Sequence, residues 1–260
     1  MLNIHIPKAV LYCLYILVLF ACTDFENEAN PAINISDEFH IDMYQSLDQS
    51  IFDLILDIST SENYGCENYK IGIDYFNTSS GIELTFNDIL APEFCEEGTG
   101  SAITLINIPE KDLNQRVRFS FTDEIYDEAD LTIDANTVEL DFMSNNGIKF
   151  FISKLHRIPI NTLTCVFKYD ISINQVEIEE KLNVLTQIVK PTILTDGYYG
   201  YFSVEEQKIV AKNNPYSFSL GLHYDISTLS KKDLSSFENQ LSEIQNLLSD
   251  ELSLDLFKTY

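Results

Sequence analysis

The densest group of candidate metal ligands is an acidic segment at residues 123–130. It places five carboxylates within eight residues, namely Asp123, Glu124, Asp127, Glu128 and Asp130. Carboxylate oxygens are the ligands that Ca²⁺ prefers, although the spacing is not that of an EF-hand loop and the turn glycine is missing. The segment therefore predicts a calcium site, and the alternative is a solubilising loop that keeps a sheet edge from pairing.

A second candidate site is the aromatic run at residues 198–202, which follows Gly197. If this run forms a strand, alternate rings project to opposite faces. Phe202 has no polar atom and is predicted to face the core, so Tyr199 and Tyr201 are predicted to face solvent. Two tyrosines on one face could bind a sugar ring or another protein. The alternative is that the rings pack in the core or in a turn.

Signature motifs of common enzymes are absent from the sequence. It contains no Gly-x-Ser-x-Gly, no His-Glu-x-x-His, no phosphate-binding glycine loop and no Cys-x-x-Cys. His40, His156 and His223 are far apart along the chain and are interpreted as surface residues. A pair of carboxylates could hydrolyse a polymer, but among 41 acidic residues no pair can be nominated. We therefore assign no catalytic residue and expect no cofactor other than calcium.

The charge balance excludes one class of partner. The sequence has 16 Lys and Arg against 41 Asp and Glu, for a net charge of −25. Such a chain repels the phosphates of nucleic acids and gains nothing from counterion release on binding them. It also avoids direct contact with anionic lipid head groups.

Residues 1–21 have the pattern of an export signal. Lys8 precedes an uncharged run from residue 9 to residue 20, and Ala21 and Cys22 follow. The run is too short to cross a bilayer as a helix, which needs about 20 residues. Basic, apolar and small-residue regions in this order are typical of a secretory signal peptide. Alternatives are an ordinary cleaved signal with an incidental cysteine and an uncleaved anchor.

The sequence Leu19-Phe20-Ala21-Cys22 resembles the lipobox of bacterial lipoproteins, apart from the bulky Phe20. The resemblance implies that Cys22 becomes a lipidated N-terminus, which carries acyl chains such as palmitate and attaches the protein to the membrane. It places the protein in the cell envelope, at the outer membrane, with the periplasmic or surface face left open. Residues 22–37 are polar and acidic and are predicted to form a tether.

The remaining cysteines predict one disulfide. An exported chain meets an oxidising compartment, where cysteines pair. Cys66 and Cys95 have polar, loop-like neighbours, whereas Cys165 lies in the alternating run 163–169, as a small buried apolar residue would. We predict a bridge between Cys66 and Cys95 and a free Cys165.

Alternating hydrophobicity indicates a first, all-β domain at residues 38–146. Strands are predicted at 50–58, 69–76, 81–87, 102–108, 116–122, 130–134 and 137–142, with a hairpin loop at 77–81. Seven short strands separated by turns predict an antiparallel, immunoglobulin-like β-sandwich. For residues 44–58 a helix is the alternative, because apolar residues there also fit helical spacing.

Residues 147–260 are predicted to form a second, α+β domain. Asn174 with Glu177, and Ser230 with Asp233, have the spacing of capping boxes before amphipathic helices. Pro191 ends the first helix. From residue 162 onward the predicted order is β-α-β-β-α-β, which is the arrangement of a ferredoxin-like fold.

Taken together, the sequence predicts a lipid-anchored envelope protein that works as a non-catalytic binding or assembly module. Its expected partners are the membrane, through the lipid, and a protein or glycan. The alternative is a hydrolase of an extracellular polymer that uses a carboxylate pair.

Overall fold

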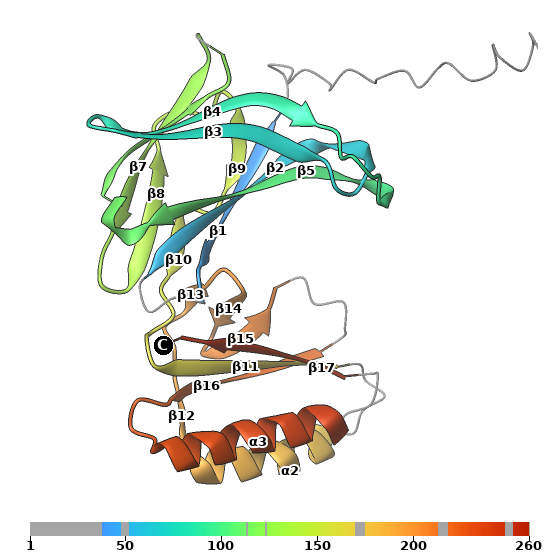
Figure 1. Cartoon of the computed structure of the whole chain (residues 1–260). Helices are drawn as coiled ribbons and strands as arrows, with labels where there is room; N and C mark the ends of the chain where they lie inside the picture. The colour runs from blue at the N-terminus through green and yellow to red at the C-terminus, as the bar shows by residue number, and fades with distance from the viewer. Residues whose placement is uncertain are drawn as a thin grey trace, which may run out of the picture.

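The described residues are mostly β, with strands stacked in several sheets and the helices α2 and α3 on one side (Figure 1). The computed structural model describes residues 38–47, 52–112, 114–122, 124–169, 175–212, 218–247 and 252–259. The predicted signal peptide, its Cys22 and nearly all of the predicted tether lie outside these residues. None of the helices formed by the described residues is both apolar enough and long enough to cross a membrane.

The first ten strands form a sandwich of two sheets. Its elements are β1 (Phe39–Gln45), β2 (Asp53–Cys66), β3 (Lys70–Thr78), β4 (Gly81–Leu90), β5 (Glu97–Pro109), the short 3-10 helix η1 (Glu110–Asp112), β6 (Gln115–Ser120), β7 (Tyr126–Ile133), β8 (Thr137–Phe142), β9 (Ile148–Phe151) and β10 (Lys154–His156). All seven strands predicted for this half of the chain are present, and so is the hairpin between β3 and β4.

One sheet has the order β5-β2-β1-β9 and the other β10-β8-β7-β6-β4-β3. The pairs β1–β9 and β4–β6 are parallel. The expectation of an entirely antiparallel sandwich is therefore wrong at these two contacts. The helical alternative for residues 44–58 is also wrong, because the chain there ends β1 and then forms β2, paired antiparallel with it.

The predicted domain boundary at residue 147 is wrong for two strands. β9 pairs with β1 in one sheet, and β10 pairs with β8 in the other. Ile148 and Leu155 are fully buried in the sandwich core. Short local segments cannot reveal which sheet they join, because that depends on their partners, which are more than one hundred residues away for β9 and 15–19 residues away for β10.

The disulfide prediction is confirmed. Cys66 and Cys95 are bonded, with Cα atoms 5.3 Å apart, and Cys165 is free and buried. The bridge closes a loop spanning a sequence separation of 29 residues. In the chain-entropy view, closing such a loop stabilises the fold by about 3–4 kcal/mol.

The C-terminal part contains β11 (Thr162–Tyr169), α2 (Gln175–Ile188), β12 (Pro191–Thr192), β13 (Gly197–Tyr198), β14 (Phe202–Glu205), β15 (Lys208–Ala211), β16 (Phe218–Asp225), α3 (Lys231–Leu247) and β17 (Leu252–Lys258). Both predicted helices are present. At the second predicted capping box, the Asp233 amide donates to the Ser230 hydroxyl, so Ser230 caps the helix, and the hydroxyl donates to the Asp233 carboxylate. Asn174 of the first predicted box lies outside the described residues.

The main sheet of the C-terminal part has the order β12-β16-β11-β17, and every pair in it is antiparallel. Helices α2 and α3 cover one face (Figure 1). A three-stranded sheet, β13-β14-β15, covers the other face and lies between the main sheet and the sandwich (Figure 1). The predicted order has its middle strands at residues 200–204 and 217–225. The second of these is β16, but the first corresponds to β14 in the small sheet, and the unpredicted β12 takes its place in the main sheet, so the prediction is wrong at that strand.

Candidate functional site

The outer face of the six-stranded sheet carries a group of polar and aromatic side chains that we call the arginine face. Its members are Phe76 on β3, Glu83 on β4, Arg116 and Arg118 on β6, and Tyr126 and Glu128 on β7. The alternating burial pattern of β6 sends its arginines outward and the intervening Val117 into the core. Along such a strand, one set of alternate side chains forms the outer surface, and the residues between them pack in the sandwich core.

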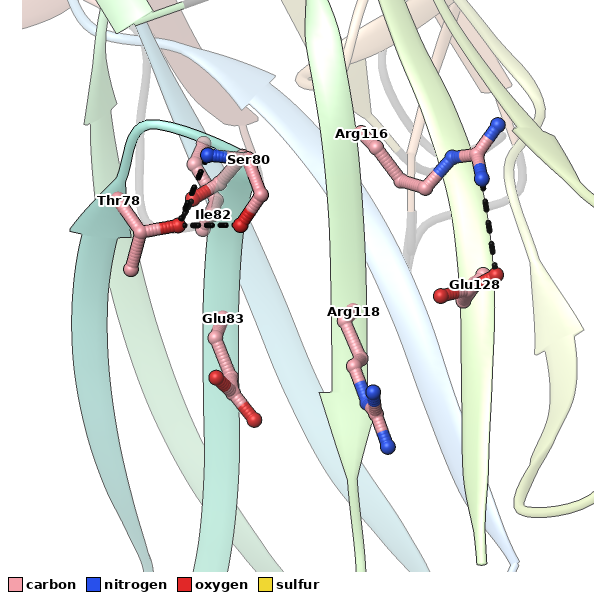
Figure 2. A pocket seen from close by; sticks show the side chains of 8 residues that line it. Thr78, Ser80, Ile82, Glu83, Arg116, Arg118 and Glu128 are labelled. Atoms are coloured by element: carbon pink, nitrogen blue, oxygen red, sulfur yellow. Dashed lines mark hydrogen bonds and ion pairs between the residues drawn. The ribbon is translucent and has the colours of Figure 1, made fainter.

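Strand register places one row of this face side by side. Phe76 pairs with Glu83, Glu83 with Arg118, and Arg118 with Glu128. Figure 2 shows Glu83, Arg118 and Glu128 on three neighbouring strands. Arg118 therefore lies between two carboxylate-bearing side chains on the adjacent strands.

A glycine allows β4 to lie this close to β6. Gly81 has φ +138°, and a Cβ at this position would stand 2.3 Å from the carbonyl oxygen of Arg116. The hairpin before it is held by the Thr78 hydroxyl, which lies 2.8 Å from that of Ser80 and donates to the Gly81 carbonyl. These contacts fix the upper end of the face in Figure 2.

The two arginines differ in their partners. Arg116 Nε lies 3.3 Å from Asp130 Oδ1, and its Nη1 lies 3.8 Å from Glu128 Oε2. Arg118 instead stacks on Tyr126, with its Cζ 3.8 Å from the ring centroid. Its Nε is buried and has no hydrogen-bond partner among the described residues. Stacking leaves the hydrogen-bonding edge of a guanidinium available to a planar anion.

Two neighbouring cavities meet at Arg118. One of about 300 Å³ is lined by Arg118, Glu83 and Glu128 among others, and Figure 2 shows it. Another of about 280 Å³ shares Glu83 and Arg118 and extends past Ser120. Their sizes are at the lower end of those of small-molecule sites. The arrangement is suited to binding, since charged donors and acceptors converge on open space.

Sequence reasoning missed the arginine face, although a signal was present. The chain contains three arginines, and two of them are Arg116 and Arg118. Residues two apart on a strand share a face. In a chain with net charge −25, such a pair marks an unusual local concentration of positive charge.

A second polar group, the junction cluster, joins the sandwich to the C-terminal part. It consists of Asp42, Tyr44, Asp57, Tyr198 and Lys212. The ammonium of Lys212 donates to Asp42, to Tyr44 at 2.5 Å and to Tyr198 at 2.8 Å. The Tyr198 hydroxyl donates to Asp42 Oδ1 at 2.5 Å, and its pKa is raised by burial and by this carboxylate.

Asp42 and Asp57 stand opposite each other on β1 and β2 and thus form a pair of carboxylates on neighbouring strands. Burial, and then the charge of Asp42, raise the pKa of Asp57. A protonated acid beside an ionised one is a catalytic pattern. However, Asp42 already accepts bonds from the Met43 amide, Tyr44, Tyr198 and Lys212. Its role is therefore to hold Lys212 and the two parts together.

The predicted calcium ligands do not converge. Asp127 is fully buried, and its carboxylate accepts hydrogen bonds from the backbone amides of residues 146, 147 and 148. Glu128 and Asp130 lie near Arg116. The described residues contain no group of three or more His, Cys, Asp or Glu arranged to hold a metal.

The physical reason is that β7 begins at Tyr126, so most of the acidic segment is strand rather than loop. Successive side chains then point to opposite faces. Asp123 lies outside the described residues, and Glu124 is in the short turn before the strand. The four carboxylates in the described residues are thus divided between the core, the outer face and the turn.

The predicted exposure of the tyrosine pair is wrong, and the alternative, that the rings pack in the core, is confirmed. Tyr199 is 2% exposed and stacks on Phe202, and Tyr201 stacks on Phe257 and donates to the carbonyl of Gln45. Phe202 is buried as expected. The strict alternation fails because Gly200 has φ +83° and the strand begins only at Phe202. Both rings belong to the core and its junction with the sandwich.

The histidines also differ from the surface prediction. His223 is 3% exposed, its Nδ1 lies 2.8 Å from the Thr164 hydroxyl, and burial lowers its pKa to about 4. The ring of His156 lies 5.3 Å from that of Tyr199, and burial lowers its pKa too. His40 is exposed, as predicted, and contacts the Ser61 hydroxyl at 2.9 Å.

Comparison with known proteins adds no functional assignment: no family model, no curated protein and no solved structure matches the chain.

Proposed function

We propose that this chain is a lipid-anchored protein of the cell envelope that acts by binding, with the arginine face as its ligand surface. The observation that carries the proposal is the position of the Arg118 side chain and its lack, within the described residues, of a hydrogen-bond partner at Nε. Its guanidinium is ordered on Tyr126 and borders two cavities, yet its buried Nε has no partner among the described residues. A buried donor without a partner costs free energy, and binding a ligand would recover it.

Binding is favoured over the alternative, hydrolysis by a carboxylate pair. General acid–base chemistry needs one carboxylate free to take up a proton. Asp42, one member of the only carboxylate pair considered above, has both oxygens engaged by donors that include Lys212. The arginine face, by contrast, offers donors and acceptors next to open space. Its partner is a glycan or a protein, and not a nucleic acid, given the net charge of −25.

The anchor supports a location at the outer membrane. Lys8, the short apolar run and Cys22 together resemble a lipoprotein signal. An acidic chain gains nothing from anionic head groups, so attachment depends on acyl chains, each buried CH₂ contributing about 0.8 kcal/mol.

Replacing Cys22 with serine is expected to release the protein from membranes. The variant lacks the thiol to which the lipid is attached, and more than one acyl chain is needed for stable anchoring. Membrane fractionation together with labelling by a fatty-acid probe measures this. Cys165→Ser, at a buried and free cysteine, is the matched control and should stay in the membrane fraction. Unchanged membrane association of Cys22→Ser would refute lipidation.

We further propose that the C-terminal part is ferredoxin-like and that the sandwich is immunoglobulin-like. The sheet order β12-β16-β11-β17 with antiparallel pairs, and both helices on one face, support the first assignment. Two stacked β-sheets support the second in architecture only, since the parallel pairs β1–β9 and β4–β6 depart from it.

The binding proposal predicts that Arg118→Gln abolishes recognition of a ligand that the wild-type protein binds. The test is an array of glycans and peptides probed with the purified protein. Lys154→Gln is the matched control, because Lys154 lies on the edge strand β10 of the same sheet and its removal changes the net charge equally. The proposal is wrong if every ligand bound by the wild type is bound equally by Arg118→Gln.

A further inference from the structure

We infer that the arginine face recognises an acidic saccharide, meaning a short chain of sugar rings of which one carries a carboxylate. The inference rests on the proposed binding function and specifies its ligand. It is drawn from the charges, the aromatic rings and the open space around Arg118.

Arg118 supplies the contact for the carboxylate. Its Cζ lies 3.8 Å from the centroid of the Tyr126 ring, and this contact holds the guanidinium against the ring. Its buried Nε is unpaired within the described part of the chain. A guanidinium held in this way can donate two parallel hydrogen bonds to a carboxylate. Arg116 is less available, because it already lies near Glu128 and Asp130.

The flanking carboxylates select the type of anion. Glu83 and Glu128 lie on either side of Arg118 in register. They would repel a phosphate, which carries about −1.5 to −2 charges at neutral pH. A carboxylate on a sugar brings one charge together with hydroxyl groups. Those hydroxyls can donate to Glu83 and Glu128, since ionised carboxylates are acceptors only.

Two exposed rings border the row of charges. Phe76, opposite Glu83, is 52% exposed, and Tyr126 is 37% exposed. Large aromatic side chains exposed beside convergent polar groups offer a surface for the apolar face of a sugar ring. A free amino acid or a small inorganic anion would leave these rings unused.

The open space suits more than one sugar ring. The cavities of about 300 and about 280 Å³ share Glu83 and Arg118. One extends toward Thr78 and Ser80 at the hairpin, and the other toward Thr122. A linear oligosaccharide could thus follow the strands, with Arg118 at its centre.

The test is calorimetric titration of the purified protein with three probes. These are a galactose oligomer that carries a single galacturonic acid residue, a galactose oligomer of the same length without it, and inorganic phosphate. The acidic oligomer is expected to bind at least tenfold more tightly than the neutral one, and phosphate is expected not to compete. Arg118→Gln should weaken binding of the acidic oligomer at least tenfold, and Lys154→Gln should leave it within threefold. Thermal unfolding of both variants verifies that they fold.

Each alternative outcome overturns a different statement. Equal or tighter binding of the neutral oligomer, lost in Arg118→Gln, refutes the acidic ligand while the binding surface stands. Competition by phosphate shows a general anion site and also refutes the ligand class. Binding of the acidic oligomer that survives Arg118→Gln shows that the arginine face is not its site. Absence of binding to all three probes overturns the inference. The array of glycans and peptides described above then tests the proposed binding function separately.

Discussion

Replacing Asp127 with alanine is expected to lower the free energy of unfolding by about 3 kcal/mol or more. Asp127 Oδ1 accepts the Asn146 amide at 2.6 Å, and Oδ2 accepts the amides of Gly147 and Ile148, both at 2.8 Å. The side chain is fully buried. Alanine would leave these amides without their acceptor, and each buried unpaired donor costs about 1–3 kcal/mol. Urea denaturation measures the loss.

Asp130→Asn on the same strand is the control for this substitution. Asp130 is exposed and belongs to a surface ion pair with Arg116, so its loss should cost at most about 1 kcal/mol. If Asp127 were instead a calcium ligand, adding calcium would raise the free energy of unfolding of the wild type. Asp127→Ala would then abolish only this calcium-dependent increase. An Asp127→Ala variant within 1 kcal/mol of the wild type would show that the buried carboxylate does not hold the segment that enters β9.

Acidification is expected to destabilise the protein through His223. Burial lowers the pKa of this histidine to about 4, whereas an unfolded histidine titrates near 6.5. Between these values the unfolded state binds the proton more readily, so stability falls as the pH falls. The contribution is fully present above about pH 6.5 and is lost by about pH 4. It amounts to about 3 kcal/mol.

The measurement is the free energy of unfolding at several pH values for the wild type and for His223→Gln. Many carboxylates titrate over the same range, so the difference between the two proteins isolates the histidine. The wild type should lose about 3 kcal/mol more than the variant on acidification from pH 7.5 to 4. His40→Gln, at an exposed histidine, should follow the wild type. Parallel curves for the wild type and His223→Gln would contradict the assignment.

The features that the sequence predicted correctly are encoded locally. Strands β2 to β8 follow from alternating residues, although β1 was not predicted, and helix α3 follows from Ser230 and Asp233 at its start. The pairing of Cys66 with Cys95 follows from the character of their neighbours. In each case residues within a few positions of one another determine the outcome.

The features that the sequence failed to predict depend on distant contacts. Tyr201 is covered because Phe257 and Gln45 reach it from opposite ends of the chain. Asp127 is buried because its carboxylate oxygens accept hydrogen bonds from backbone amides about twenty residues away. The arginine face requires the parallel pairing of β4 with β6, and no local sequence pattern predicts this pairing. Composition and periodicity do not contain this information.

Strand β1 has a mechanical consequence. It lies between β2 and β9, and its last residue is bonded to the C-terminal side of the sandwich, where the Gln45 side chain accepts the Ile158 amide at 2.8 Å. If the N-terminus is fixed to a bilayer, as proposed above, tension enters this strand at Phe39 and leaves it at Gln45. Hydrogen bonds between strands run across the strand direction, so the load shears both ladders together instead of opening them one bond at a time. In that arrangement β1 would bear a drag force on the C-terminal part in the geometry in which a paired strand resists extension.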